Sequence, residues 1–89
     1  MDQNAAETLA LKGLARIAGD EDLLPAFLAA TGIAPEDLRQ RAGDPEVLAA
    51  VMDFLLADEG RLIAFCEDEG IKPERALAIR RALPGWSDG

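Results

Sequence analysis

The longest apolar segment of the chain is VLAAVMDFLLA, residues 47–57, in which Asp53 is the only polar residue. Just before it, Asp44 can cap a helix, Pro45 suits the first helical position, and Glu46 favours the positive end of a helix. On a helix, the large apolar side chains of this segment cover most of the circumference, which is typical of burial on most sides. At about 1.5 Å per residue the segment is about 16 Å long, well short of a bilayer core. We therefore predict a core helix and not a membrane span.

Five more helices are predicted around this one. Asn4 with Glu7 fits a capping box that opens the first helix, and Gly19 ends it. Apolar residues at helical spacing, bounded by glycine and proline, indicate the others. We expect these helices to run from Asp22 or shortly before it to Gly32, from Pro35 to near Gly43, from the break at residues 58–60 to Gly70, and from Pro73 to Pro84.

The two halves of the chain resemble each other. Residues 20–36 read DEDLLPAFLAATGIAPE and residues 58–74 read DEGRLIAFCEDEGIKPE, and nine of these seventeen positions match at a constant offset of 38 residues. The matches include glycines that end helices, prolines that begin them, and two candidate core residues, Phe27 and Phe65. Each half is too small to bury its own apolar face, whereas two stacked halves can. We predict one all-α domain, a compact six-helix bundle of two tandem three-helix repeats at about 5–43 and 44–84, with a short tail at 85–89.

Composition and charge narrow the function classes. The chain has 89 residues, 49% hydrophobic and 29% charged, and no tyrosine, a balance that favours one helical domain. A net charge of −8 should repel phosphate backbones and anionic membranes. Cys66 is the only cysteine, which excludes an internal disulfide, and the N-terminal residues lack the pattern of a secretory signal. These features predict a cytoplasmic protein of bacterial type.

The sequence offers few reactive groups. It has no histidine and a single serine, Ser87, so neither that serine nor Cys66 has a histidine base. We expect Cys66 to be a small buried hydrophobe. The acidic clusters at residues 20–22, 58–59 and 67–69 lack the ligand spacing of a calcium loop. We therefore predict no catalytic, cofactor-binding or metal-binding residue, no cofactor, and no enzyme activity.

Asp53 has two interpretations. The favoured one places it on a narrow solvent-facing stripe of the central helix. The second pairs it with an arginine, either Arg16 or one from a second subunit, because an unpaired buried carboxylate is too costly.

The function best matched by this pattern is a protein–protein interaction module, with an unknown partner or a second copy of the chain. Its contact surface would be a groove between the repeats or the tail around Trp86. The alternative is a DNA-binding protein, because residues 27–41 and 65–81 each resemble a helix-turn-helix. Acidic residues at the front of each would-be recognition helix, Glu36 and Glu74 among them, oppose DNA binding. The arginines that would contact DNA are Arg39, Arg41, Arg75, Arg80 and Arg81.

Three segments, LALKGLARIAGDEDLLPAFLAATGI, DPEVLAAVMDFLLADE and RRALPG, carry a family resemblance. Through them nearly the whole chain resembles a family of short alphaproteobacterial proteins catalogued as a domain of unknown function, DUF3572. The resemblance implies a compact all-helical fold and an alphaproteobacterial origin. It implies no catalytic or binding residue.

Overall fold

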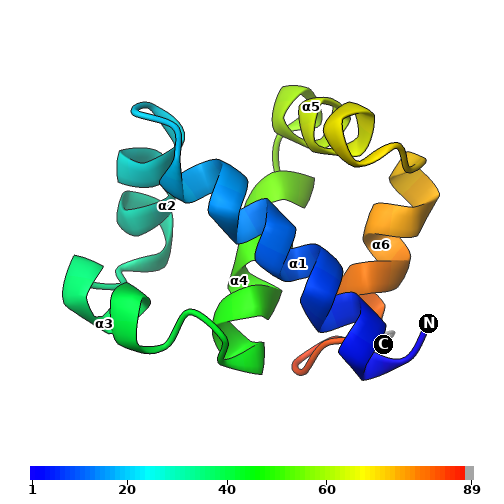
Figure 1. Ribbon diagram of the computed structural model, residues 1–89, viewed down its shortest axis with the longest axis horizontal. Helices are drawn as coiled ribbons and strands as arrows, with labels where there is room; N and C mark the ends of the chain where they lie inside the picture. Colours follow the sequence, from blue (N-terminus) through cyan, green and yellow to red (C-terminus); the bar gives the residue numbers. More distant parts are fainter. Residues whose placement is uncertain (88–89) are drawn as a thin grey trace.

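Six α-helices run through residues 1–87, which are the residues that the computed structural model describes (Figure 1). No strand occurs among these residues, so the predicted all-α class is confirmed. Over the same residues, no helix has both the length and the apolar character needed to cross a membrane. Residues 88–89 of the predicted tail lie outside the described residues. The helices are α1 (Gln3–Ala18), α2 (Leu23–Thr31), α3 (Pro35–Gln40), α4 (Pro45–Leu56), α5 (Glu59–Glu69) and α6 (Pro73–Arg81).

Short acidic side chains fix where several helices begin. The carboxylate of Asp44 accepts a hydrogen bond from the N–H of Glu46 at 2.9 Å, as expected for the cap of α4. The prediction for α1 is wrong, because Asn4 lies inside the helix and Asp2 is the cap. The carboxylate of Asp2 accepts from the N–H of Ala5 at 2.8 Å. An aspartate adds a negative charge at the positive end of the helix, so it displaces the asparagine as cap.

Helices α2 and α5, which correspond to each other in the predicted repeat, end in similar but not identical turns. Gly32 after α2 and Gly70 after α5 have φ angles of +73° and +66°, the left-handed conformation expected from the sequence. After α5, the N–H of Ile71 donates to a carbonyl oxygen of the helix at 2.9 Å. After α2, the N–H of Ile33 instead donates to the hydroxyl of Thr31 at 3.3 Å. In the turn after α2, the Thr31 hydroxyl thus takes the place of the backbone carbonyl that accepts this hydrogen bond after α5.

Helix α4 is the centre of the fold, as the apolar pattern predicted. It contacts α1, α2, α5 and α6, and Val51, Met52 and Leu55 have no exposed surface. In Figure 1, α1 crosses in front of α4, with α2 and α3 to one side and α5 and α6 to the other. The Cα radius of gyration is 12.0 Å, which matches the roughly 12 Å of a compact domain of this length.

The crossing of α1 and α4 pairs small residues with large ones. Gly13 of α1 is buried, and a Cβ atom at this position would lie 3.2 Å from Leu55 Cδ1 and 3.3 Å from Val51 Cγ1. Ala6 and Ala10, on the same face of α1, are also fully buried. The absence of bulk on α1 therefore lets the large side chains of α4 approach its backbone.

The third helix of each half is packed differently. Helix α6 contacts α1, α4 and α5, and it buries Ala76, Ile79 and Arg80. Helix α3 has only six residues, and Leu38 is its only buried residue. The short α3 leaves apolar side chains of α1 and α2 incompletely covered.

Candidate functional site

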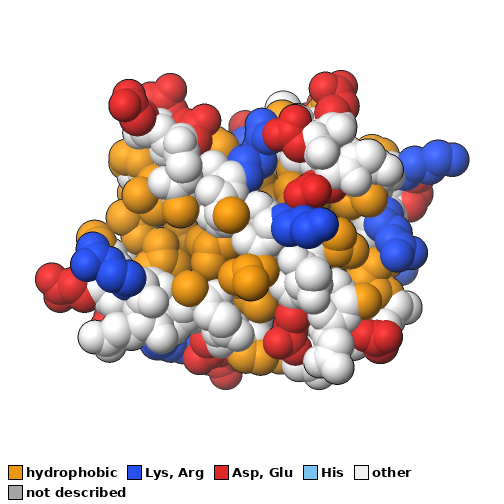
Figure 2. Space-filling model, in the orientation of Figure 1, with side chains coloured by type: hydrophobic (Ala, Val, Ile, Leu, Met, Phe, Trp, Pro, Cys, Tyr) orange, Lys and Arg blue, Asp and Glu red, His pale blue; other side chains and the backbone are white. Residues whose placement is uncertain are grey.

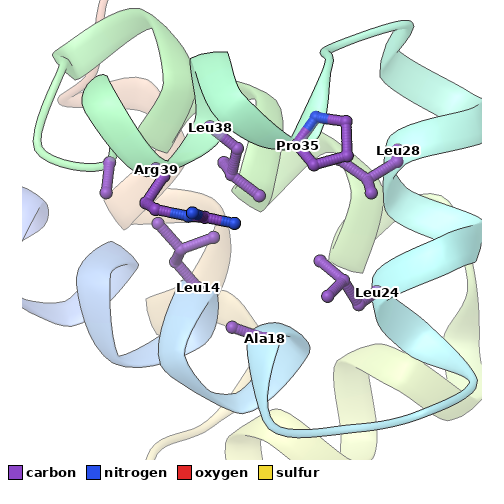
Figure 3. A pocket seen from close by; sticks show the side chains of 8 residues that line it. Leu14, Ala18, Leu24, Leu28, Pro35, Leu38 and Arg39 are labelled. Carbon is purple, nitrogen blue, oxygen red and sulfur yellow. The ribbon is translucent and has the colours of Figure 1, made fainter.

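The incomplete cover by α3 produces an apolar pocket between α1, α2 and α3 (Figure 3). Its volume is about 300 Å³, and seven of its eight lining residues are apolar. A pocket of this size lies at the small end of the range for ligand sites, about 300–1,000 Å³. We call it the α1–α3 pocket. It is lined by Leu14, Ala18, Leu24, Leu28, Pro35, Leu38, Arg39 and Ala42.

Helical spacing brings these side chains together. On α2, Leu24 and Leu28 are four residues apart, so both face the pocket. On α1, Leu14 and Ala18 have the same spacing and form the opposite wall. Both leucines of α2 are half-buried, whereas Leu38 of α3 is buried. The pocket is therefore a gap in the core that is open to solvent.

Arg39 is the only charged residue that lines the pocket. Its side chain extends from α3 beside Leu38, and Figure 3 shows its guanidinium pointing across the pocket towards α2. The residue is exposed, and within residues 1–87 its side chain forms no hydrogen bond or ion pair. Its alkyl stem can cover apolar surface while the charged end remains in water. Arg39 was one of the predicted DNA-contacting residues, but in the structure it lines the α1–α3 pocket.

The apolar surface continues beyond the pocket along α1. Leu11 is 46% exposed, and it lies on the same side of the helix as Ala15 and Ala18, four and seven residues further on. Figure 2 shows hydrophobic side chains gathered over α1, α2 and α3 on this face of the molecule. Acidic side chains lie at the edge of this surface, near the α1–α2 turn and on α3.

Most of the other predicted DNA-contacting arginines are engaged within the chain. The guanidinium of Arg41 lies 3.3 Å from the carboxylate of Asp44 and 3.8 Å from that of Glu46. Arg80 is buried, and Arg81 lies over the Trp86 ring at 5.8 Å. Arg75 is exposed on α6. The structure therefore contradicts the assignment of Arg80 to a DNA-facing surface.

Arg80 instead joins α6, α4 and the tail. Its Nε donates to Asp53 Oδ1 at 2.7 Å, and its Nη1 donates to the carbonyl oxygens of Leu83 at 3.4 Å and Pro84 at 3.0 Å. Its guanidinium also lies 5.6 Å from the centre of the Trp86 ring, within the range of a cation–π contact. The tail at Trp86 is thus folded back onto α6.

Asp53 is exposed, as the favoured interpretation predicted, and it is also paired with an arginine. The predicted partner Arg16 is wrong. Arg16 forms an ion pair with Asp68 of α5 instead. The partner of Asp53 is Arg80, 27 residues further along the chain, and local spacing could not identify it.

Cys66 is buried, as predicted. Burial, and secondarily the negative charge of Glu74, raise the pKa of the Cys66 thiol, which keeps it in the neutral form. A buried neutral thiol is a poor nucleophile and a poor metal ligand. Among the described residues, no group of three or more histidine, cysteine, aspartate or glutamate side chains could hold a metal ion.

The α1–α3 pocket is the site that sequence reasoning missed. Leu24, Leu28 and Leu38 follow helical spacing, and that pattern alone does not distinguish a core residue from the wall of a pocket. The signal that could have found the pocket is the shortness of α3, which cannot cover both α1 and α2.

Comparison with known proteins gives one match. No curated protein and no solved structure matches the chain. The family model described as "Protein of unknown function (DUF3572)" matches residues 3–86, which is nearly the whole sequence. The expected resemblance is confirmed, and the chain belongs to the DUF3572 family.

Proposed function

We propose that this protein is a protein–protein interaction module without catalytic activity, and that the α1–α3 pocket is its docking surface. The observation that supports this proposal is the open apolar pocket of about 300 Å³ with seven apolar lining residues. Removing apolar surface from water contributes about 25 cal/mol per Å², from which the entropy cost of association is subtracted. Contiguous exposed apolar patches on soluble proteins mark interaction sites once they reach several hundred Å², so the apolar side of α1 must contribute to the contact as well. The lining contains no carboxylate, thiol or hydroxyl, so it favours binding over chemistry.

The shape of the surface favours a protein partner over a small molecule. The pocket is small and open, so a small ligand would keep much of its own surface in water. The exposed apolar side of α1, with Leu11 and Ala15, extends the contact area beyond the pocket. An extended partner that covers both would bury more apolar surface.

Site-specific photo-crosslinking in the native host tests this function. A photoreactive amino acid at Ala18, on the pocket wall, should form a covalent adduct with another polypeptide. The matched control is the same amino acid at Ala29, an exposed alanine of α2 that does not line the pocket. Equal adducts from both positions, or none from Ala18, would contradict the proposal.

We also infer that the two halves derive from one duplicated three-helix unit. Helix boundaries support this inference, because the ends of α1 and α4, the ends of α2 and α5, and the starts of α3 and α6 are each 38 residues apart. Buried positions recur at the same offset. The pairs are Ala10 and Leu48, Leu14 and Met52, Ile17 and Leu55, and Phe27 and Phe65.

Divergence between the halves accounts for the pocket. At the offset of 38 residues, Ala18 corresponds to Leu56 and Ala42 corresponds to Arg80. Both first-half residues line the pocket, and both are smaller than their counterparts. The partly buried Leu56 and the buried Arg80 are the larger counterparts in the second half, while in the first half we propose that the open space takes a partner. We further expect the protein to act in the bacterial cytoplasm, where the lone thiol of Cys66 stays reduced.

A further inference from the structure

The geometry points to one kind of occupant for the α1–α3 pocket, and this inference rests on the interaction function proposed above. The occupant is an amphipathic helix of a different protein. It inserts large apolar side chains between α1 and α2 and places a carboxylate against the guanidinium of Arg39. Charge complementarity, shape and the acidic edge of the surface support this inference in turn.

The charge of Arg39 is uncommitted at the site where a partner would dock. Arg16, Arg41 and Arg80 form ion pairs, and Arg61 and Arg81 lie over the rings of Phe54 and Trp86. Arg39 has no such partner among residues 1–87, and the same is true of Arg75, which lies on α6 and does not line the α1–α3 pocket. Covering the pocket with a wholly apolar segment would desolvate this guanidinium without compensation. A carboxylate on the partner offsets that cost, because guanidinium and carboxylate can form two parallel hydrogen bonds.

The shape of the apolar surface suits a helix. Leu11, Ala15 and Ala18 follow one side of α1, and the pocket opens beside Ala18. A helix laid along this side would present apolar residues at spacings of three and four. An acidic residue on the same face of that helix would reach Arg39.

The acidic edge of the surface argues against a second copy of this chain. The exposed Asp20, Glu21 and Asp22 lie at the α1–α2 turn, and Glu36 and Asp37 lie on α3. Each copy carries a net charge of −8, so two copies would repel one another as they approach. A partner helix with basic residues flanking its apolar face meets these acids favourably.

Selection from a displayed library of helical peptides tests the inference with the full-length protein as bait. Wild type should enrich peptides with leucine, phenylalanine or tryptophan at spacings of three or four, an aspartate or glutamate on the same face, and flanking lysine or arginine. With Arg39→Glu as bait, the enriched acid should change to lysine or arginine. For one synthesised wild-type-selected peptide, Arg39→Gln should weaken binding about five- to tenfold.

Two variants locate the binding site on the molecule. Ala18→Lys places a long charged side chain at the mouth of the pocket from an exposed helical position, so the core is untouched, and it should abolish the enrichment. Ala29→Lys makes the same change outside the pocket and should leave the enrichment intact. Circular dichroism spectra equal to wild type would confirm that both variants fold.

The outcomes separate this inference from the broader function. Peptides that require the pocket but show no acidic preference, or the same preference with Arg39→Glu, would overturn the pairing with Arg39 and leave the docking surface standing. Peptides that bind Ala18→Lys as well as wild type would overturn both proposals. A concentration-dependent dimer in sedimentation, lost in Ala18→Lys, would replace the partner helix with a second copy.

Discussion

Gly13 has a packing role that only the three-dimensional structure reveals. Its missing side chain admits Val51 and Leu55 of α4, and Phe65 Cε1 would lie 3.4 Å from an added Cβ. In sequence, a glycine in the middle of a helix reads only as a weak point, because it costs about 0.5–1 kcal/mol relative to alanine. In this fold, the missing side chain of Gly13 allows α1 and α4 to approach closely.

We predict opposite consequences for small and large substitutions at this position. Gly13→Ala should change the free energy of unfolding by less than about 1 kcal/mol, because the gain in helix propensity offsets a tight contact with flexible side-chain ends. Gly13→Leu should lower it by about 1–3 kcal/mol through overpacking. Urea denaturation followed by circular dichroism measures both. A Gly13→Leu variant as stable as wild type would contradict the described crossing of α1 and α4.

The ion pair of Arg80 and Asp53 joins a buried side chain to an exposed one. The Arg80 side chain is 7% exposed, whereas that of Asp53 is 58% exposed. Removal of Arg80 leaves the carbonyl oxygens of Leu83 and Pro84 without their donor, while removal of Asp53 leaves two of the three bonds of Arg80 in place. The two residues should therefore contribute unequally to stability.

We predict that Arg80→Met lowers the free energy of unfolding by about 2–4 kcal/mol. Asp53→Asn should lower it by about 1 kcal/mol or less, because the carboxylate is largely solvated. Arg75→Met, at an exposed arginine of the same helix, is the matched control and should stay within about 0.5 kcal/mol of wild type. Equal losses for Arg80→Met and Arg75→Met in urea denaturation would exclude the anchoring role of Arg80.

At the scale of helices, some glycines are needed for their backbone conformation and not for their small size. Gly32 and Gly70 have left-handed φ angles, and no atom lies within 4 Å of a Cβ placed at either position. Gly43 has the same open surroundings without the left-handed angle. Gly32→Ala and Gly70→Ala should each lower the free energy of unfolding by about 1–2 kcal/mol, whereas Gly43→Ala should not lower it. Thermal melts of the three single variants would show the difference, and equal shifts in all three would contradict it.

The turn between α1 and α2 depends on an ionised aspartate. The carboxylate of Asp20 accepts hydrogen bonds from the N–H groups of Leu23 at 2.9 Å and Asp22 at 2.8 Å. These bonds, with the bond from Leu23 contributing most, and the charge of Arg16 lower the pKa of Asp20. Because the folded pKa lies below the unfolded value of about 3.9, Asp20 stabilises the fold above pH 4. This contribution is lost as the pH falls through the folded pKa.

We therefore expect Asp20→Asn to reduce the difference in urea midpoint between pH 7 and pH 3. An NMR titration of the side-chain carboxyl carbon in wild type should give a pKa for Asp20 below its usual value. Asp22→Asn is the matched control. Because the side chain of Asp22 makes no capping hydrogen bond, this variant should keep the wild-type urea midpoint at pH 7. An Asp20 carboxyl that titrates at or above its usual value would contradict the geometry of this turn.

At the scale of the whole molecule, neither half of the chain should fold alone. The buried side of α1, with Ala10, Gly13 and Ile17, belongs to the same core as the large residues of α4 in the other half. A fragment of about 40 residues without a disulfide or metal rarely has enough core to fold. Fragments 1–43 and 44–89 should each give weak helical circular dichroism, and mixing them should restore it. A cooperative melt of either fragment alone would show that the halves are independent domains.

Much of this architecture could be predicted from sequence because its signals are local. Proline and glycine at helix boundaries placed α3, α4 and α6 to within a few residues, and the apolar segment identified α4 as the core helix. The partner of Asp53 could not be predicted, because it depends on how α6 crosses α4. The α1–α3 pocket could not be predicted either, since it results from the short α3 and from small side chains, Ala18 and Ala42, at positions that a periodic pattern treats as core.

The docking of Trp86 onto Arg80 and Arg81 has a practical consequence. Trp86 is the only tryptophan of the chain, and no tyrosine competes with it, so intrinsic fluorescence reports on the surroundings of Trp86, which include Arg80 and Arg81. Detachment of the tail from α6 should alter the emission spectrum, whereas neither Arg80 nor Arg81 lines the α1–α3 pocket, where a tryptophan-free ligand would bind. The emission spectrum can thus monitor the integrity of the α4–α6 junction while binding at the opposite helices is followed by another signal.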